Sequence, residues 1–161
     1  MSTRTWSGPG AGDRQRILAS TTVVAVVGAS SNPARASFFV STYLLASTGF
    51  TVYFVNPHET TILGRPVYPC LAALPETPEL VDVFRRLPDV AAVLAEAIEA
   101  RASTFWMQLG LWDEAVAADA EAAGLQVVMD RCLKIEHARF HGGLHLAGFD
   151  TGVIDSRRPV R

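Results

Sequence analysis

The sequence predicts an α/β protein with a doubly wound, Rossmann-like parallel sheet of about five strands in a single domain. Short apolar runs rich in β-branched residues recur along the chain, and each is followed by a stretch whose apolar residues have helical spacing. The first run, at residues 22–27, is continuous and apolar, as is typical of a strand buried on both faces of a parallel sheet. The length of 161 residues suits one domain with one hydrophobic core.

The first half of the chain predicts a strand, a helix and a second strand. The first strand is expected at residues 22–27, a continuous apolar run, and a helix follows at 36–47. The second strand is expected at 51–55 and ends at Asn56-Pro57, because proline lacks the N–H that a strand ladder needs. This order favours a parallel βαβ unit with the first strand at the centre of the sheet.

The second half repeats the alternation after an irregular, proline-containing connection at residues 58–78. That connection leaves room for a short strand at 66–68. Further strands are predicted at residues 80–84, 104–108 and 125–129, and further helices at 90–101, 113–123 and 134–140. Five strands with intervening helices imply a parallel sheet that is covered on both faces.

The predicted domain spans residues 17–140, between a flexible N-terminal segment at 1–16 and a tail at 141–161 that packs in part on the domain. The first sixteen residues lack the apolar stretch of a signal peptide, and no apolar run approaches the roughly 20 residues that cross a membrane. The formal net charge of -2 gives no field that attracts nucleic acid or an anionic membrane. With only Cys70 and Cys132 and no CxxC, we expect free thiols and a cytoplasmic protein.

The turn after the first predicted strand, GASSNPAR at residues 28–35, carries groups that bind phosphate. Gly28 permits a tight turn, and residues 30–32 offer donors beside the start of a helix, where anions bind in doubly wound sheets. Capping of that helix without any ligand is the alternative. The GxGxxG fingerprint is absent because serine and proline stand at positions 30 and 33.

The first turn and four later regions carry a resemblance to a known family. These are GASSNPAR at 28–35, VNP at 55–57 followed by LGRPVYP at 63–69, DVFR at 82–85, WMQLG at 106–110 and MDRC at 129–132. Together they resemble the small stand-alone CoA-binding domain family, which is similar to the CoA-binding domain of the succinyl-CoA synthetase α subunit. The resemblance covers roughly residues 17–140.

The resemblance implies coenzyme A as the ligand and a site at the edge of the sheet. It implies CoA phosphates at Gly28, Ala29, Ser30, Ser31 and Asn32, the nucleotide against Val55, Asn56 and Pro57, and the path to the pantetheine arm along Phe84, Arg85, Gln108, Leu109 and Gly110. Many relatives place lysine after the Asn-Pro pair, where this chain has His58 and Glu59. We hypothesise that His58, Arg35 or Arg65 makes the contact with the 3′-phosphate instead.

No catalytic or metal site is predicted, since GxSxG, HExxH and a P-loop lysine are all absent. Cys132 is interpreted as a buried structural thiol, and a nucleophile or a mixed disulfide with CoA is the alternative. His137 and His141 are four residues apart, as in a helical metal pair, but Gly142-Gly143 favours a surface helix end.

These patterns predict a non-catalytic protein that binds CoA or acyl-CoA, with the phosphates at the first strand–helix turn. An NAD(P)-binding oxidoreductase is one alternative, although Asn56 stands near where dehydrogenases carry an acidic residue for the ribose. A CoA-binding subunit of a split acyl-CoA synthetase, catalytic only with a partner chain, is another. We expect no nucleic-acid or membrane partner and leave a protein partner open.

Overall fold

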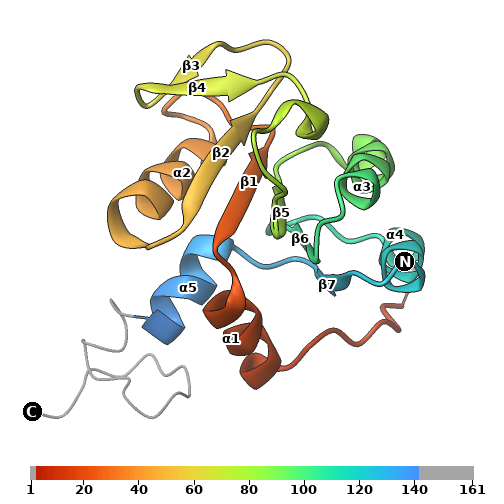
Figure 1. Cartoon of the computed structure of the whole chain (residues 1–161). Helices are drawn as coiled ribbons and strands as arrows, with labels where there is room; N and C mark the ends of the chain where they lie inside the picture. The colour runs from red at the N-terminus through yellow and green to blue at the C-terminus, as the bar shows by residue number, and fades with distance from the viewer. Residues whose placement is uncertain (1–2, 142–161) are drawn as a thin grey trace, which may run out of the picture.

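The computed structural model describes residues 3–141, which form one sheet with helices on both faces (Figure 1). Within these residues the strands are β1 (Val23–Val27), β2 (Thr51–Val55), β3 (Thr61–Ile62), β4 (Arg65–Tyr68), β5 (Leu80–Val83), β6 (Thr104–Met107) and β7 (Gln126–Val128). The helices are α1 (Ala11–Ser20), α2 (Ala36–Ser47), α3 (Val90–Glu99), α4 (Glu114–Ala122) and α5 (Leu133–His141), with short 3-10 helices at Leu71–Ala73 and Leu87–Asp89.

The predicted doubly wound α/β class is confirmed, but the strand number is seven instead of about five. The order is β3-β4-β2-β1-β5-β6-β7, and every neighbouring pair is parallel except the antiparallel pair β3–β4. The strands β3 and β4 form a small hairpin beside β2 and account for the difference. They are too short to show a period, and Pro66 lies in β4, where proline argues against a strand.

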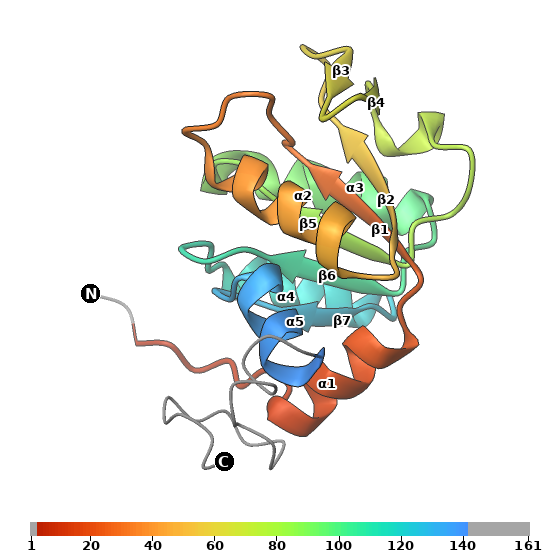
Figure 2. The ribbon, with the colours of Figure 1, turned by 90° about the vertical axis from the view of Figure 1, so that its left-hand side faces the viewer.

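Two hydrophobic layers cover the faces of the sheet, as Figure 2 shows with α1, α2 and α5 on the near face and α3 and α4 behind. Val24 and Val26 of β1 belong to the first layer, whereas Ala25 and Val27 belong to the second. Every residue of β1 is therefore buried, which explains its uninterrupted apolar sequence. No helix within residues 3–141 combines the length and the apolar character needed to cross a bilayer.

Helix α1 begins inside the range 1–16, where the sequence analysis expected no structure. It buries Ile17, Leu18 and also Arg14, whose Nε donates to Glu136 Oε1 of α5 at 2.6 Å. This ion pair joins residues 122 positions apart, so the local sequence carries no sign of it. The predicted tail at 141–161 lies outside the described residues, apart from the backbone of His141.

The register of the central strands aligns their carboxyl ends. Val27 is paired with Val55 and with Val83, and Val83 is paired with Met107. The residues that follow these four therefore form one row along the sheet edge, namely Gly28, Asn56, Phe84 and Gln108. The row crosses the point between β1 and β5 where the strand order reverses, and ligands of doubly wound proteins bind at such points.

Candidate functional site

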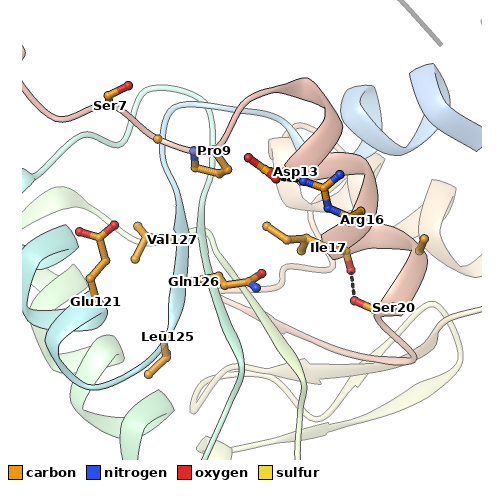
Figure 3. Close-up of a pocket in the computed structure, with 12 residues that line it drawn as sticks. Ser7, Pro9, Asp13, Arg16, Ile17, Ser20, Glu121, Leu125, Gln126 and Val127 are labelled. Carbon is orange, nitrogen blue, oxygen red and sulfur yellow. Dashed lines mark hydrogen bonds and ion pairs between the residues drawn. The ribbon is translucent and has the colours of Figure 1, made fainter.

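Two hollows among the described residues differ in place and in charge. The first, here called the N-terminal groove, has a volume of about 880 Å³ and lies between residues 7–9, α1, the end of α4 and β7 (Figure 3). Its charged residues are Asp13, Arg16 and Glu121, which give a formal charge of −1. Arg16 forms an ion pair with Asp13, and Glu121 accepts a hydrogen bond from Trp6 Nε1. The groove contains none of the predicted site residues.

The second hollow, the carboxyl-edge cavity, has a volume of about 500 Å³ and lies at the row of residues that follow the strands. Its lining consists of Gly28, Ser30, Arg35, Ala36, Ser37, Asn56, Val83, Phe84, Arg85, Arg86, Asp89, Gln108, Leu109 and Leu111. Three arginines and one aspartate give this lining a formal charge of +2. It therefore suits an anion, whereas the N-terminal groove does not.

Gly28 fixes the first turn against the loop after β5. Its φ of 87° lies in the left-handed region, and a Cβ built on it would approach the carbonyl oxygen of Phe84 to 1.9 Å. The N–H of Gly28 donates to Val55 O at 2.9 Å, and the N–H of Phe84 donates to Val27 O at 2.8 Å. No other residue type fits this position without moving the backbone.

The polar side chains of the turn bond within the turn and do not cap α2. Ser30 Oγ accepts from the N–H of Asn32 at 3.0 Å, and Asn32 Oδ1 accepts from the N–H of Ala34 at 2.9 Å. The N-cap residue of α2 is Arg35, and its side chain makes no capping hydrogen bond. Since Ala36 and Ser37 line the cavity, the uncapped start of a 12-residue helix borders it. Such a helix end attracts anions.

Asn56 ties the loop after β2 to the first turn. Its Nδ2 donates to Ala29 O at 2.8 Å, and its Oδ1 accepts from the N–H of His58 at 2.8 Å. Beyond it, the N–H of Ser31 donates to both carboxylate oxygens of Glu59, each at 3.0 Å. The two loops are thus held together by side-chain bonds on either side of the turn.

Arginines provide the positive charge of the cavity. Arg86 is exposed and lies 3.5 Å from Asp89, measured from Nε to Oδ2. Arg35 and the half-buried Arg85 form no ion pair within residues 3–141. Their guanidinium groups are therefore available to an anionic ligand, and a guanidinium matches two phosphate oxygens at once.

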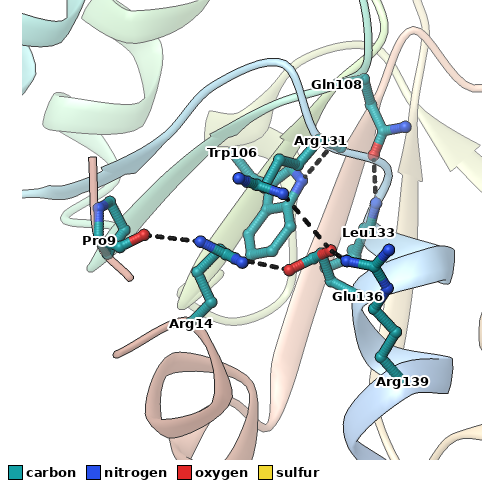
Figure 4. A network of polar contacts seen from close by, with 8 residues as sticks. All are labelled: Pro9, Arg14, Trp106, Gln108, Arg131, Leu133, Glu136 and Arg139. Carbon is teal, nitrogen blue, oxygen red and sulfur yellow. Dashed lines mark hydrogen bonds and ion pairs between the residues drawn. The ribbon is translucent and has the colours of Figure 1, made fainter. Parts of the chain in front are cut away.

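Gln108 is positioned by a polar network beneath the cavity (Figure 4). Its Oε1 accepts from the N–H of Leu133, the first residue of α5, at 2.9 Å, and its amide nitrogen points away from that contact. The network continues through Trp106 Nε1, which donates to Arg131 O at 2.8 Å. With 6% of its surface exposed, Gln108 has a fixed orientation and keeps an amide donor for a ligand.

Asp82 lies in β5, two residues before Phe84 in the row. It is completely buried, and neither carboxyl oxygen has a hydrogen-bond partner within the described residues. Burial raises the pKa of Asp82 well above its usual value, because the apolar surroundings disfavour the carboxylate. Burial therefore favours the protonated form of this carboxyl group.

The structure brings together about half of the predicted site residues. Gly28, Ser30, Arg35, Asn56, Phe84, Arg85, Gln108 and Leu109 line the cavity. The other predicted residues do not: Ala29 and Val55 are buried, Ser31, Asn32, Pro57, His58 and Gly110 are exposed away from its lining, and Arg65 belongs to β4.

The sequence analysis missed six lining residues, namely Ala36, Ser37, Val83, Arg86, Asp89 and Leu111. Ala36 and Ser37 begin the helix after the first turn, and Arg86 directly follows a predicted site residue. Their positions next to predicted site residues could have identified these three from the sequence. Asp89 and Leu111 could not have been identified in this way, because tertiary packing sets the paths of their loops.

The cysteines and histidines lie elsewhere. Cys70 and Cys132 are half-buried free thiols. His137 was predicted on a surface but is buried, with Tyr43 Oη 2.8 Å from its Nδ1 and the ring of Phe50 beside it. The side chain of His141 is outside the described part, within which no group of three or more potential ligands is placed to hold a metal ion.

Comparison with known proteins identifies the family of the chain. The CoA binding domain family matches residues 22–138. The uncharacterized protein YneT of Bacillus subtilis is 33% identical over 130 residues, which cover 81% of this chain and 96% of the relative. A hypothetical protein from Pyrococcus horikoshii superposes with a TM-score of 0.81 at 34% identity, covering 88% of this chain and 99% of that one.

A more distant likeness shows the fold alone. An acetyl-coenzyme A synthetase from Ca. Korarchaeum cryptofilum superposes with a TM-score of 0.61 at 21% identity, over 66% of this chain and 25% of that one. The family match and the relatives above 30% identity confirm the resemblance that the sequence motifs indicated. The chain belongs to the CoA-binding domain family.

Proposed function

We propose that the protein binds coenzyme A or an acyl-CoA in the carboxyl-edge cavity and catalyses no reaction by itself. One observation carries the proposal: Gly28, Asn56, Phe84 and Gln108 lie in one row at the switch point, within a positively charged cavity. The family assignment supplies the ligand class. The row supplies the amide nitrogen of Gln108, and the start of α2 and the neighbouring arginines add groups that attract an anion.

The phosphates of CoA fit the part of the cavity around the first turn. The uncapped start of α2 and the unpaired Arg35 and Arg85 are groups that stabilise phosphate. Among the three residues considered for the 3′-phosphate, Arg35 lines the cavity, whereas His58 and Arg65 do not. Gln108 and the 67% exposed Leu109 suit the amides and the carbon chain of the pantetheine arm.

The lining supports binding without catalysis. Among residues 3–141, the lining includes no histidine or cysteine, and the hydroxyl of Ser30 is engaged by the N–H of Asn32. Asp82 lies behind the row, and its burial favours the protonated form, which cannot act as a general base. If the protein worked with a catalytic partner chain, that partner would have to supply the reacting groups.

Calorimetric titration of the folded, ligand-free protein tests the proposal, with CoA, acetyl-CoA and NAD as parallel ligands. We expect dissociation constants for CoA or acetyl-CoA on the order of micromolar, and weaker binding of NAD, because within residues 3–141 the lining offers no carboxylate for the adenosine ribose of NAD other than the paired Asp89. Absence of heat with both CoA ligands, or tighter binding of NAD, would contradict it.

A further inference from the structure

Glu59 holds a backbone donor of the first turn. The N–H of Ser31 donates to Glu59 Oε1 and Oε2, each at 3.0 Å. Within residues 3–141 the half-buried carboxylate of Glu59 forms no ion pair. Ser31 lies outside the cavity lining but directly follows the lining residue Ser30, so an internal anion lies beside the turn where the proposed function puts a phosphate of the ligand.

The loop that carries Glu59 is fixed by bonds in which its side chain takes no part. The N–H of Asn56 donates to Tyr68 O at 2.9 Å, and its Nδ2 donates to Ala29 O at 2.8 Å. The N–H of His58 donates to Asn56 Oδ1 at 2.8 Å. Rotation of the Glu59 side chain alone therefore frees the Ser31 N–H, and the rest of the loop keeps its place.

We propose that Glu59 determines the affinity of the site by competing with the ligand for the Ser31 N–H. This inference rests on the proposed function. A carboxylate and a phosphate are both anionic acceptors of the same kind of strong hydrogen bond, so only one of them takes this donor. A carboxylate that stayed in place would also repel the phosphate. Binding of CoA then requires the loss of the Ser31–Glu59 contact, and the free protein keeps its turn ordered by that contact.

The substitution Glu59→Gln distinguishes a carboxylate that competes with the ligand from one that only holds the turn in place. Glutamine keeps the size and an acceptor oxygen but removes the charge, so we expect CoA to bind about tenfold more tightly. Glu99→Gln is the matched control, since Glu99 is exposed at the last residue of α3, outside the cavity lining, and loses the same charge. Its affinity for CoA should stay within about twofold of wild type, as expected for a screened, distant charge.

The calorimetric outcomes separate the two proposals. Equal affinities for wild type and E59Q would overturn the competition while leaving CoA binding intact. Weaker binding by E59Q would also overturn it, because the carboxylate would then contact the ligand, for example a ribose hydroxyl. No CoA binding by wild type, E59Q or E99Q would overturn the proposed function itself.

A second readout needs no variant. In a ¹H–¹⁵N spectrum of the wild-type protein, saturating CoA should shift the Ser31 amide resonance, because its acceptor changes from carboxylate to phosphate. A Ser31 resonance that stayed in place in protein with bound CoA would overturn the inference.

Discussion

The N-terminal groove and the carboxyl-edge cavity are built in different ways. The groove is the larger, at about 880 Å³ against about 500 Å³, but side chains from a terminal segment, two helices and one edge strand form it. The cavity is smaller, and its floor is the row of residues that the register of four parallel strands aligns. A site needs fixed donors and the right charge, so the cavity is the better candidate despite its size.

The carboxyl groups behind the cavity and near the groove also differ in the direction of their pKa shifts. Behind the cavity, burial raises the pKa of Asp82. Near the groove, hydrogen bonds from the side chain and backbone of Thr5, and one from Trp112, lower the pKa of Glu114 to about 2. Arg4 belongs to the same region, with its guanidinium 4.0 Å from the ring centroid of Trp112 and bonded to Asp130. The terminal segment is thus anchored by contacts that serve stability, whereas the cavity leaves polar groups free for a ligand.

Replacement of a glycine in each region gives the largest expected contrast. Gly28→Ala should abolish measurable CoA binding, a loss of at least about a hundredfold, and cost about 3 kcal/mol or more of stability, because the Cβ meets Phe84 O at 1.9 Å. Gly124→Ala between α4 and β7 also has a positive φ, of 92°, but nothing lies within 4 Å of its Cβ. It should cost only about 1 kcal/mol and leave CoA binding unchanged. CoA titration and chemical unfolding of both variants measure this contrast, and unimpaired binding by a folded G28A protein would contradict the account.

Removal of an arginine from each hollow should give the second largest contrast in CoA affinity. Arg35→Ala and Arg85→Ala should each weaken CoA binding by roughly tenfold to a hundredfold, because each removes a charged donor from the cavity. Arg16→Ala removes a cation from the groove and should leave the dissociation constant within about twofold of wild type. Calorimetry at fixed salt checks all three, and a larger effect from Arg16 would assign the ligand to the groove.

Truncation of Trp6 should affect stability without affecting binding. Trp6 packs edge-on against Trp112 with ring centroids 5.6 Å apart, and its indole N–H donates to Glu121. Since Trp6 is half-buried, Trp6→Ala should lower the free energy of unfolding by about 2 kcal/mol. Urea unfolding measures the loss, and CoA titration of the folded variant should show no change. Reduced CoA affinity would mean that the terminal segment takes part in the site.

The two perturbed carboxyl groups predict pH effects of opposite sign. The folded protein keeps the Asp82 proton that the unfolded chain releases above the usual pKa of 3.8, so this group contributes less stability as the pH rises from there. Asp82→Asn should flatten the fall in stability as the pH rises above 3.8, by at most about 1.4 kcal/mol per pH unit. Glu114 stabilises the fold above its usual pKa of 4.5, and this contribution is lost as the pH falls toward about 2. Glu114→Gln should therefore lower stability at pH 7 but not at pH 2. Urea unfolding across this range checks both signs, and a steeper fall for D82N would contradict the assignment of a buried, protonated Asp82.

Sequence reasoning recovered the parts of the fold that local patterns encode. The five strands of the main sheet were predicted because each is a short, mainly apolar run, and α2 was predicted with its observed bounds, Ala36–Ser47. The short strand allowed for at residues 66–68 is found as β4, whereas β3 and α1 were not predicted. Thr61–Ile62 is too short to carry a period, and α1 is held by the pairing of Arg14 with Glu136, a contact between distant parts of the chain.

The candidate site likewise contains residues that the sequence identifies and residues that only contacts between loops bring into place. Gly28 was predicted from its place in the turn after the first strand, whereas Asn56, Phe84 and Gln108 were expected from the family resemblance. The structure aligns all four because each directly follows a strand of the sheet. The exposed His58 was proposed because it stands where relatives carry lysine, but the path of a loop beyond its first residue cannot be derived from sequence position. The contact of Glu59 with Ser31 was missed for the same reason, since it depends on how two loops lie together.

Mapping the amide resonances of the described residues during CoA titration tests the central claim most directly. The account predicts that the amides of the lining residues Ser30, Arg85, Gln108 and Leu109 shift with one dissociation constant, while those of Gly8, Ile17 and Val127 in the groove stay unchanged. Shifts confined to the groove residues would contradict the assignment of the ligand to the carboxyl edge of the sheet.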